Sequence, residues 1–305
     1  MSSDLKNPFS PFSPDLAESL RRQVRIALEE DVGSADLTAD YLLADRLITA
    51  HVIVREDAVL CGAPWFDAVM EEVDGQGRVH MAWHYAEGDT LRAQEVVCMV
   101  RGPERTLLTA ERTALNFLQL LSGIAGTTRE YVRQLVGMPT GIYDTRKTLP
   151  GLRLAQKYAV RVGGGYNQRM GLYDAILVKE NHIVAAGGIG AALHKVKNGH
   201  IPVQIEVENL AELAEALAAG AKSVLLDNFT RDMMREAVAL TGGRAVLEAS
   251  GNIGMQDVRA VAETGVDRIS IGALTKHVRA TDYSLRVAER AGGGQTHTHK
   301  NVKEC

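Results

Sequence analysis

The second half of the chain alternates short apolar runs with longer amphipathic segments. The runs, most of them dense in Val, Ile and Leu, occupy residues 141–143, 175–178, 203–207, 223–226, 245–247 and 268–271. Such runs are typical of strands buried on both faces, and the intervening segments have the length of crossover helices. The pattern favours a parallel α/β barrel, while periodicity alone leaves an open doubly wound sheet as the alternative. No Gly-x-Gly-x-x-Gly follows the first run, which argues against a dinucleotide-binding fold.

The first half contains helices and strands without this regular alternation. A stripe of apolar residues predicts a helix from Asp15 to about residue 30, and residues 63–73 resemble another. Alternating positions predict strands at residues 47–54, 80–84 and 96–100. A long leucine-rich helix is expected at 106–121, and a second helix after Gly126. These elements predict an α+β domain over 15–125, followed by the barrel domain over 126–280.

The two ends of the chain differ from these domains. Residues 1–14 are polar and rich in proline, which predicts a flexible N-terminus without a signal peptide. Residues 281–291 are expected to form a C-terminal helix that returns to the first domain. Residues 292–305 contain three consecutive glycines and two histidines, and a disordered tail is expected there.

Composition narrows the possible classes of function. The chain has 305 residues, of which 46% are hydrophobic and 24% charged, as in ordinary globular proteins. A net charge of −4 provides no global basic field for nucleic acid, and no apolar run is long enough to cross a membrane. Three scattered cysteines have neither metal-ligand spacing nor a disulfide pattern. A cytoplasmic location is therefore expected.

Charged residues recur where the apolar runs end. They include four cations, Arg146, Lys147, Arg169 and Lys179. The carboxyl ends of parallel strands share one rim of a barrel, so these cations should converge there. Their mutual repulsion is offset if they bind a polyanion, because Arg matches carboxylates with two parallel hydrogen bonds. A solvated basic loop is the alternative for Arg146 and Lys147, whereas Lys157 and Arg161 are assigned to an exposed helix face.

Carboxylates form a second group on the predicted rim. Glu206 and Asp227 follow two neighbouring runs, with Glu208 close by. Mg²⁺ is commonly bound by one or two carboxylates together with substrate phosphates, so Glu206 and Asp227 are candidate metal ligands. Structural ion pairing with the cations is the alternative. His182 follows Lys179 closely, and we expect it to make a structural hydrogen bond rather than act as a base.

Small residues near the last two runs indicate a phosphate site. Ser250-Gly251-Asn252 is expected to open a helix, and Gly272 with Lys276 follows the next run. Backbone N–H groups exposed at a helix N-terminus stabilise phosphate, and barrels often bind phosphate at their last strands. The alternative is that these small residues only form ordinary loops between elements.

Several motifs in this half of the chain resemble one known family. They are Asp144-Thr145-Arg146-Lys147-Thr148-Leu149-Pro150-Gly151-Leu152-Arg153, Gly163-Gly164-Gly165-Tyr166-Asn167-Gln168-Arg169, Val178-Lys179-Glu180-Asn181-His182, Glu206-Val207-Glu208-Asn209, Leu226-Asp227-Asn228-Phe229, Ala249-Ser250-Gly251-Asn252 and Gly272-Ala273-Leu274-Thr275. In this order they resemble quinolinate phosphoribosyltransferase, the carboxylating nicotinate-nucleotide pyrophosphorylase. The resemblance extends from about Leu28 to about Leu285. It implies an N-terminal α+β sandwich domain followed by an incomplete parallel α/β barrel.

The resemblance also implies roles for residues. Quinolinate would be bound by Arg112, Arg146, Gln168, Arg169 and Lys179. Phosphoribosyl pyrophosphate would be bound by Lys147, Glu206, Asp227, Ser250, Gly251, Asn252, Gly272 and Lys276. Catalysis would involve Lys147, Lys179, Glu206 and Asp227, with Mg²⁺ at the last two. The family commonly has His where this chain has Gln168, which can donate a hydrogen bond but cannot carry a proton.

The expected reaction is phosphoribosyl transfer to quinolinate with loss of carbon dioxide, which gives nicotinate mononucleotide. The expected assembly is a homodimer in which Arg112 enters the neighbouring subunit's site. Three alternatives remain from the sequence: a Schiff-base aldolase using Lys179, a phosphoribosyltransferase acting on nicotinate without decarboxylation, and a phosphosugar-binding module without activity.

Overall fold

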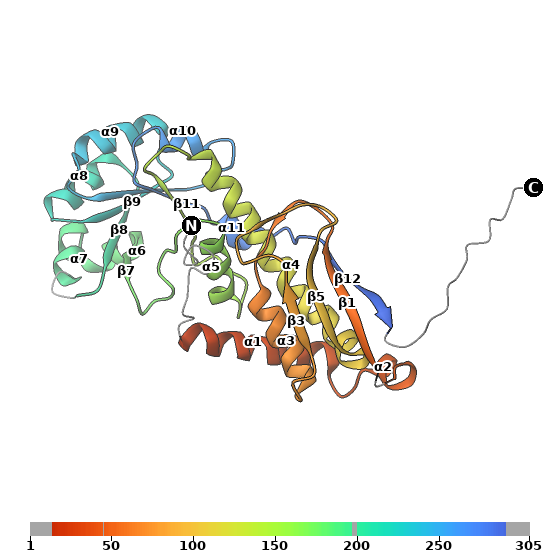
Figure 1. Cartoon of the computed structure of the whole chain (residues 1–305). Coiled ribbons are helices and arrows are strands. Elements are labelled where there is room, and N and C mark those ends of the chain that lie inside the picture. Colours follow the sequence, from red (N-terminus) through yellow and green to blue (C-terminus); the bar gives the residue numbers. More distant parts are fainter. Residues whose placement is uncertain (1–13, 45, 197–199, 291–305) are drawn as a thin grey trace, which may run out of the picture.

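A computed structural model describes residues 14–44, 46–196 and 200–290. It has an N-terminal part built on an antiparallel sheet and a C-terminal part built on a parallel sheet (Figure 1). The predicted flexible start lies outside the described residues except for Pro14, where the first helix begins. The predicted tail at 292–305 also lies outside them.

The N-terminal part packs helices on one face of a four-stranded sheet. Its elements in chain order are α1 (Pro14–Val32), α2 (Leu37–Leu42), β1 (Leu47–Val54), β2 (Ala58–Val59), α3 (Ala63–Asp74), β3 (His80–Trp83), β4 (Thr90–Leu91) and β5 (Val96–Pro103). The sheet has the order β12-β1-β5-β3. Along β1, buried Ile48, Ala50, Val52 and Val54 alternate with more exposed residues, as expected for a sheet with one covered face.

The C-terminal segment is a strand, and the prediction of a helix at 281–291 is wrong. Strand β12 (Tyr283–Arg290) pairs antiparallel with β1 and forms an edge of the N-terminal sheet. Tyr283 and Leu285 are buried, while Arg286 and Val287 are exposed. The edge of β1 offers unpaired backbone groups, and satisfying them favours a strand over an isolated helix at this position.

One long helix joins the two parts, where the sequence predicted two. Helix α4 (Glu104–Gln134) continues through both Gly123 and Gly126. A Cβ atom on Gly123 would lie 2.1 Å from the carbonyl oxygen of Arg279, so the returning chain crosses the helix directly at this position. Gly123 therefore permits a close tertiary contact and does not end the helix.

The C-terminal part contains six parallel strands. These are β6 (Gly141–Tyr143), β7 (Ile176–Val178), β8 (Val203–Val207), β9 (Ser223–Asp227), β10 (Val246–Ser250) and β11 (Arg268–Ser270). The connecting helices are α5 (Arg153–Val162), α6 (Glu180–Ala186), α7 (Ile189–Val196), α8 (Leu210–Ala218), α9 (Arg231–Thr241), α10 (Val258–Ala262) and α11 (Ala273–Lys276). Side-chain caps at Asn209 and Thr230 begin α8 and α9, because each accepts a backbone N–H of the first turn.

The strand order shows an incomplete barrel. The order β6-β11-β10-β9-β8-β7 follows the chain around a cylinder, with no bonding between β6 and β7. A doubly wound sheet would instead reverse its strand order at a switch point. Near the open side, Tyr166 makes a single parallel bridge with Tyr143 of β6. The prediction of an α+β domain followed by an incomplete parallel barrel is confirmed.

The role of β12 in stability can be tested with two residues of the strand. Leu285 packs in the core at 8% exposure, whereas Val287 is 41% exposed. Leu285→Ala should lower the free energy of unfolding by about 2–3 kcal/mol because it removes buried methyl groups. Val287→Ala should change it by less than about 0.5 kcal/mol. Urea unfolding of both variants provides the measurement, and equal losses would contradict the packing of β12 described above.

Candidate active site

The register of the parallel strands places most of the predicted residues on one rim. Asp227 lies level with Ser250, and the pairing of Val178 with Ile205 sets Lys179 beside Glu206. Tyr143 pairs with Ser270, so the loops that begin after β6 and β11 are also neighbours. The rim therefore brings together the cations, carboxylates and small residues that the sequence predicted separately.

Two arginines lie close together at the open side of this rim. Arg146 is half-buried, and its Nε atom is buried without a hydrogen-bond partner among the described residues. Burial and the neighbouring charge of Arg146 lower the pKa of Arg169, against a smaller opposing effect of Asp174. Arg169 donates one hydrogen bond to the carbonyl of Ala175, at 3.1 Å. Adjacent guanidinium groups with an unused buried donor form a site suited to an anion.

A buried ion pair includes Asp144, two residues before Arg146 in the chain. Lys157 of α5 donates to Asp144, and both side chains are fully buried. The sequence assigned Lys157 to an exposed helix face, and that assignment is wrong. The helical pattern locates Lys157 on α5, but it does not show that Asp144 lies under that face and supplies an opposite charge.

Lys179 and Glu206 contact each other across two neighbouring strands. Their Nζ and Oε2 atoms are 3.1 Å apart, with the lysine side chain 49% exposed and the glutamate 16% exposed. The predicted cationic and anionic groups thus meet in one ion pair. His182 accepts a hydrogen bond from the Lys179 backbone at 3.0 Å, which confirms the structural role expected for this histidine.

Carboxylates gather beside this ion pair. The pKa of Glu208 is raised, first by Glu180 and then by burial and by Glu212, Asp227 and Glu206. The cause is mutual repulsion that local cations do not offset. Within the described ranges, no group of three or more His, Cys, Asp and Glu residues is arranged to hold a metal ion. Any metal here would depend on a ligand to supply further oxygens.

The predicted phosphate loops differ in geometry from the expectation. Ser250-Gly251-Asn252 does not open a helix, because α10 begins only at Val258. Gly251 has φ +107°, and a Cβ atom there would lie 2.2 Å from Oδ1 of Asn228.

The neighbouring loop brings Gly272 close to Lys147. A Cβ atom on Gly272 would lie 3.2 Å from Cδ of Lys147. Thr275 also donates to the Lys147 carbonyl, at 2.8 Å. Lys276 is exposed at the end of α11.

Arg112 lies on the N-terminal part of α4. Its side chain is exposed, and within the described residues it makes no ion pair or hydrogen bond with the other predicted site residues. The surrounding turns of α4 are fixed to the N-terminal part, since Thr109 donates to Asp36 at 2.8 Å and Thr113 to Asp31 at 3.0 Å. The structure therefore does not join Arg112 to the rim of its own chain.

A polar network inside the barrel was not assigned a role from the sequence. Glu248 is fully buried and accepts hydrogen bonds from Gln168, Gln204 and Ser270. The Gln168 amide also donates to Gln204, at 3.2 Å. A glutamate inside the apolar strand 245–249 was the available signal, because a buried charge requires partners. The partners come from three other segments and could not be identified from local pattern.

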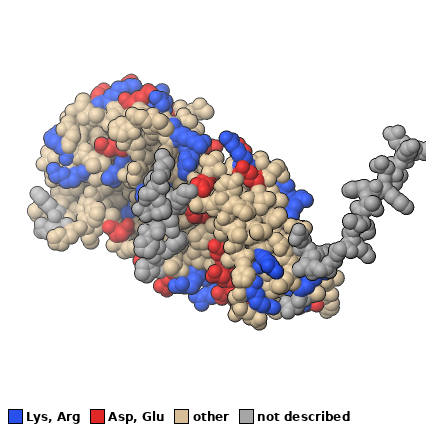
Figure 2. All heavy atoms as spheres, in the orientation of Figure 1, with Lys and Arg blue, Asp and Glu red and all other residues tan. Residues whose placement is uncertain are grey.

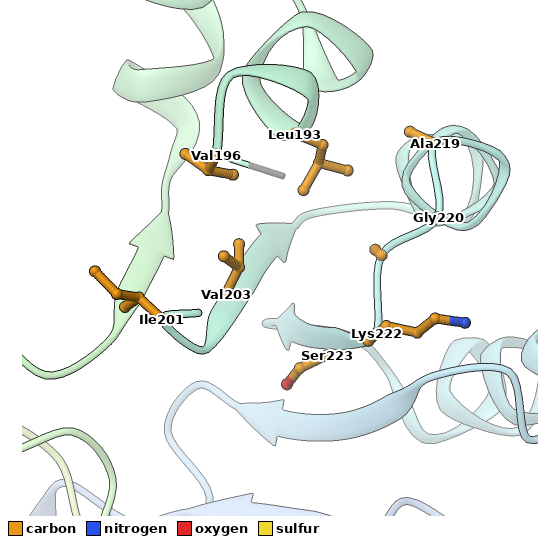
Figure 3. Close-up of a pocket in the computed structure, with 9 residues that line it drawn as sticks. Leu193, Val196, Ile201, Val203, Ala219, Gly220, Lys222 and Ser223 are labelled. Atoms are coloured by element: carbon orange, nitrogen blue, oxygen red, sulfur yellow. The ribbon is translucent and has the colours of Figure 1, made fainter. Parts of the chain in front are cut away.

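The apolar cavity in Figure 3 lies away from this rim. It has a volume of about 230 Å³ and is lined where β8 and β9 begin, by residues such as Val203 and Ser223, together with Leu193 of α7. Lys222 extends away from Leu193 and Val203 in this view. The cavity therefore faces the opposite ends of the strands from the candidate site.

The surface and the helices restrict the possible binding partners. In Figure 2, acidic and basic side chains are interspersed and form no single basic field on the visible face. None of the helices in the described part of the chain is long and apolar enough to span a bilayer.

The fold and rim define an α/β-barrel protein with cationic side chains suited to an anion at the carboxyl ends of its strands. Models of the quinolinate phosphoribosyl transferase N-terminal and C-terminal domains match residues 36–122 and 124–286. The chain belongs to this family.

Individual relatives agree with the family assignment. A probable nicotinate-nucleotide pyrophosphorylase (carboxylating) of Bacillus subtilis (strain 168) is 40% identical over 90% of this chain and 93% of its own length. The nicotinate-nucleotide pyrophosphorylase (carboxylating) of Mycobacterium leprae (strain TN) is 38% identical over 88% of this chain and 97% of its own length. The solved nicotinate-nucleotide pyrophosphorylase from Francisella tularensis is 45% identical, with a TM-score of 0.86 over 89% of this chain and 96% of that one.

Proposed function

We propose that this protein transfers phosphoribose from phosphoribosyl pyrophosphate to the ring nitrogen of quinolinate. Pyrophosphate leaves in this transfer. Loss of carbon dioxide, with uptake of a proton by the ring carbon, then gives nicotinate mononucleotide, a precursor of NAD. The observation that carries the proposal is the adjacent pair Arg146 and Arg169, with a buried unused donor, in a chain of this family. Two guanidinium groups suit the two carboxylates of quinolinate better than the single carboxylate of nicotinate.

The remaining rim residues suit the phosphoribosyl donor. Lys147 lies beside Gly272 and is exposed, so its ammonium group is available to a pyrophosphate. Ser250, Gly251 and Asn252 would bind the 5′-phosphate, with Gly272 and Lys276 on the neighbouring loop. Glu206 and Asp227 would accept hydrogen bonds from the ribose hydroxyls. Except for Lys276 at the end of α11, these residues stand on strand ends or on the loops that follow them, which supports binding of both ligands on the same rim.

Mg²⁺ fits the carboxylates of this rim. The neighbouring carboxylates that raise the pKa of Glu208 include both Glu206 and Asp227, so negative charge is in excess where a cation would bind. These two carboxylates would hold the ion together with substrate oxygens. The ion would neutralise charge on the departing pyrophosphate.

The residues of the chain would act by positioning and charge stabilisation. As the bond to pyrophosphate breaks, C1′ becomes oxocarbenium-like, and Glu206 and Asp227 stabilise the positive charge that develops. Lys147 would stabilise the leaving oxygen, and Lys179 a carboxylate of quinolinate. After transfer, the quaternary ring nitrogen withdraws electrons from the adjacent carbon, which permits decarboxylation without a covalent enzyme intermediate.

The pairing of Lys179 disfavours the Schiff-base alternative. An aldolase lysine needs a free amine to attack a carbonyl, whereas the Nζ atom of Lys179 donates a hydrogen bond to Glu206 at 3.1 Å. Borohydride treatment with a carbonyl substrate should therefore give no adduct at Lys179.

The free thiols of Cys61 and Cys98 support a reducing, cytoplasmic setting.

A carbon dioxide release assay tests the function. Protein with quinolinate, phosphoribosyl pyrophosphate and Mg²⁺ should release carbon dioxide and form nicotinate mononucleotide in equal amounts. A chelator should abolish turnover, and added Mg²⁺ should restore it. Turnover of nicotinate with no turnover of quinolinate would overturn the proposal in favour of the non-carboxylating reaction. Binding without turnover of either would indicate a binding module.

Arg146→Ala should weaken quinolinate binding by about 30-fold or more, because one charged partner of the carboxylate is lost. Binding of phosphoribosyl pyrophosphate should change less than about threefold, since all the residues assigned to it except Lys147 lie on or after other strands. Arg235→Ala is the matched control, because this arginine pairs only locally with Asp232 on the outer helix α9. Calorimetric titration of each ligand provides the measurement. Equal losses for both ligands would refute the assignment of Arg146.

Gly251→Ala should raise KM for phosphoribosyl pyrophosphate by about tenfold, because the new Cβ displaces Asn228 and strains the backbone at φ +107°. Gly254→Ala is the control, since the nearest atom to its Cβ would be 3.7 Å away. Steady-state kinetics of the two variants provide the comparison. If Gly251→Ala keeps the wild-type KM, this loop does not bind the donor substrate.

We further propose a two-fold dimer in which Arg112 completes the partner's quinolinate site. The exposed Arg112 has no link to the rim of its own chain, which supports a role in trans. Inactive Arg112→Ala and inactive Lys179→Ala proteins, co-refolded in equal amounts, should regain about one quarter of wild-type activity, because mixed dimers contain one intact site. Mass measurement controls for mixed dimers. No recovery in confirmed mixed dimers would exclude the shared site.

A further inference from the structure

We propose that the buried pair Asp144–Lys157 positions the two arginines of the quinolinate site. Asp144 directly follows β6, two residues before Arg146, and Lys157 reaches it from α5. Neither side chain is exposed, so neither contacts substrate. Their proposed effect is on the spacing of Arg146 and Arg169, and this inference rests on the proposed function.

At the open side of the barrel, the sheet does not hold the chain around Arg169 in place. Strands β6 and β7 are not hydrogen-bonded to each other, so no ladder holds the segment 167–169 that lies between them in sequence. The nearest backbone pairing is the single bridge between Tyr143 and Tyr166. Side chains must therefore fix this segment against β6.

The buried pair supplies that connection. The Asp144 carboxylate accepts the Gln168 backbone N–H at 2.9 Å and the Asn167 amide at 2.6 Å. The Lys157 ammonium donates to the Gln168 carbonyl at 2.9 Å. Both backbone polar groups of Gln168 are thus bound by the pair, which fixes the peptide on each side of this residue.

The next bonds extend from Gln168 to Arg169. The Gln168 side-chain oxygen accepts the Arg169 backbone N–H at 3.3 Å, while its amide is bound to Glu248 and Gln204 inside the barrel. Arg169 is therefore anchored to Asp144 through one residue, and Arg146 is anchored to Asp144 through the chain itself. The two arginines repel each other, so their close approach has to be imposed by the surrounding structure.

The effect should be specific for one substrate. Apart from Lys147 and Glu206, the residues assigned to phosphoribosyl pyrophosphate lie at the ends of β9 and β10 or after β11, and within the described residues none of them is hydrogen-bonded to Asp144 or Lys157. Loss of the pair should therefore misplace the two carboxylate-binding arginines and leave the donor site in place. A generally weakened fold would instead affect both substrates.

The double substitution Asp144→Asn with Lys157→Met tests the inference in the full-length protein, because it removes both charges and leaves no unpaired buried ion. KM for quinolinate should rise about 10- to 100-fold, while KM for phosphoribosyl pyrophosphate stays within about twofold. The control is Arg46→Met with Glu104→Gln, which removes another ion pair with a buried carboxylate, at 2.7 Å, in the N-terminal part. It should leave both KM values unchanged.

A crystal structure of the double variant gives a readout that does not depend on activity. The distance between the Cζ atoms of Arg146 and Arg169 should change by more than about 0.5 Å, the tolerance of a productive site. If the double variant does not fold, Asn167→Ala is the second test. It keeps the ion pair and removes the two hydrogen bonds that the Asn167 amide donates, to Asp144 and to the Lys157 carbonyl. It should raise KM for quinolinate alone, by a smaller factor.

The outcomes separate the two proposals. A wild-type protein that does not turn over quinolinate fails the proposed function, and the crystallographic distance then decides the positioning role alone. An active wild type with an unchanged KM for quinolinate in the folded variant overturns the inference. Equal rises in both KM values also overturn it, because they indicate a general structural loss.

Discussion

The parallel register of six strands is the constraint on which the candidate site depends. Because the strands run the same way and pair in sequence order, their carboxyl ends meet at one rim. Residues separated by more than a hundred positions, such as Lys147 and Gly272, become neighbours only through this arrangement. The pairing between β6 and β11 is essential here, since it joins the first unit of the barrel to the last.

The barrel is closed on all sides except between β6 and β7, and this opening shapes the electrostatics of the site. Arg146 follows β6 and Arg169 precedes β7, at the open side, while Glu206, Glu208 and Asp227 lie at the ends of β8 and β9. Positive and negative regions are thus held apart on one rim, with the Lys179–Glu206 ion pair between them. Such a division suits two ligands of different charge distribution, a dicarboxylate and a metal-bound diphosphate.

The interior of the barrel provides the polar support for this rim. Glu248 and Asp144 are fully buried carboxylates, and each accepts several hydrogen bonds. Burial raises the pKa of Asp144, whereas Lys157 and the N–H donors favour its charged form. Two buried acids with satisfied hydrogen bonds, close in the fold to the half-buried arginines, are consistent with a site held in place before ligands arrive. Helix α4 and strand β12 then connect this barrel to the N-terminal part, with Gly123 allowing the chain to cross the helix.

The sequence by itself determined the elements of the barrel and the residues at its rim. Each of the six predicted apolar runs overlaps a strand, and several of the charged residues predicted for the rim stand at strand ends, because period and burial are local properties of the chain. The family was also evident from ordered motifs.

Only the tertiary structure decided which of these residues are partners. The helical pattern predicts an exposed Lys157, but in the fold this lysine is buried in an ion pair with Asp144. The pattern of 281–291 predicts a helix, but in the fold this segment forms a strand that pairs with the backbone of β1. The Glu248 network likewise joins residues 22 to 80 positions apart. A local pattern carries no information on such contacts, because the energy of a buried charge or of an unpaired backbone group depends on atoms supplied from elsewhere in the chain.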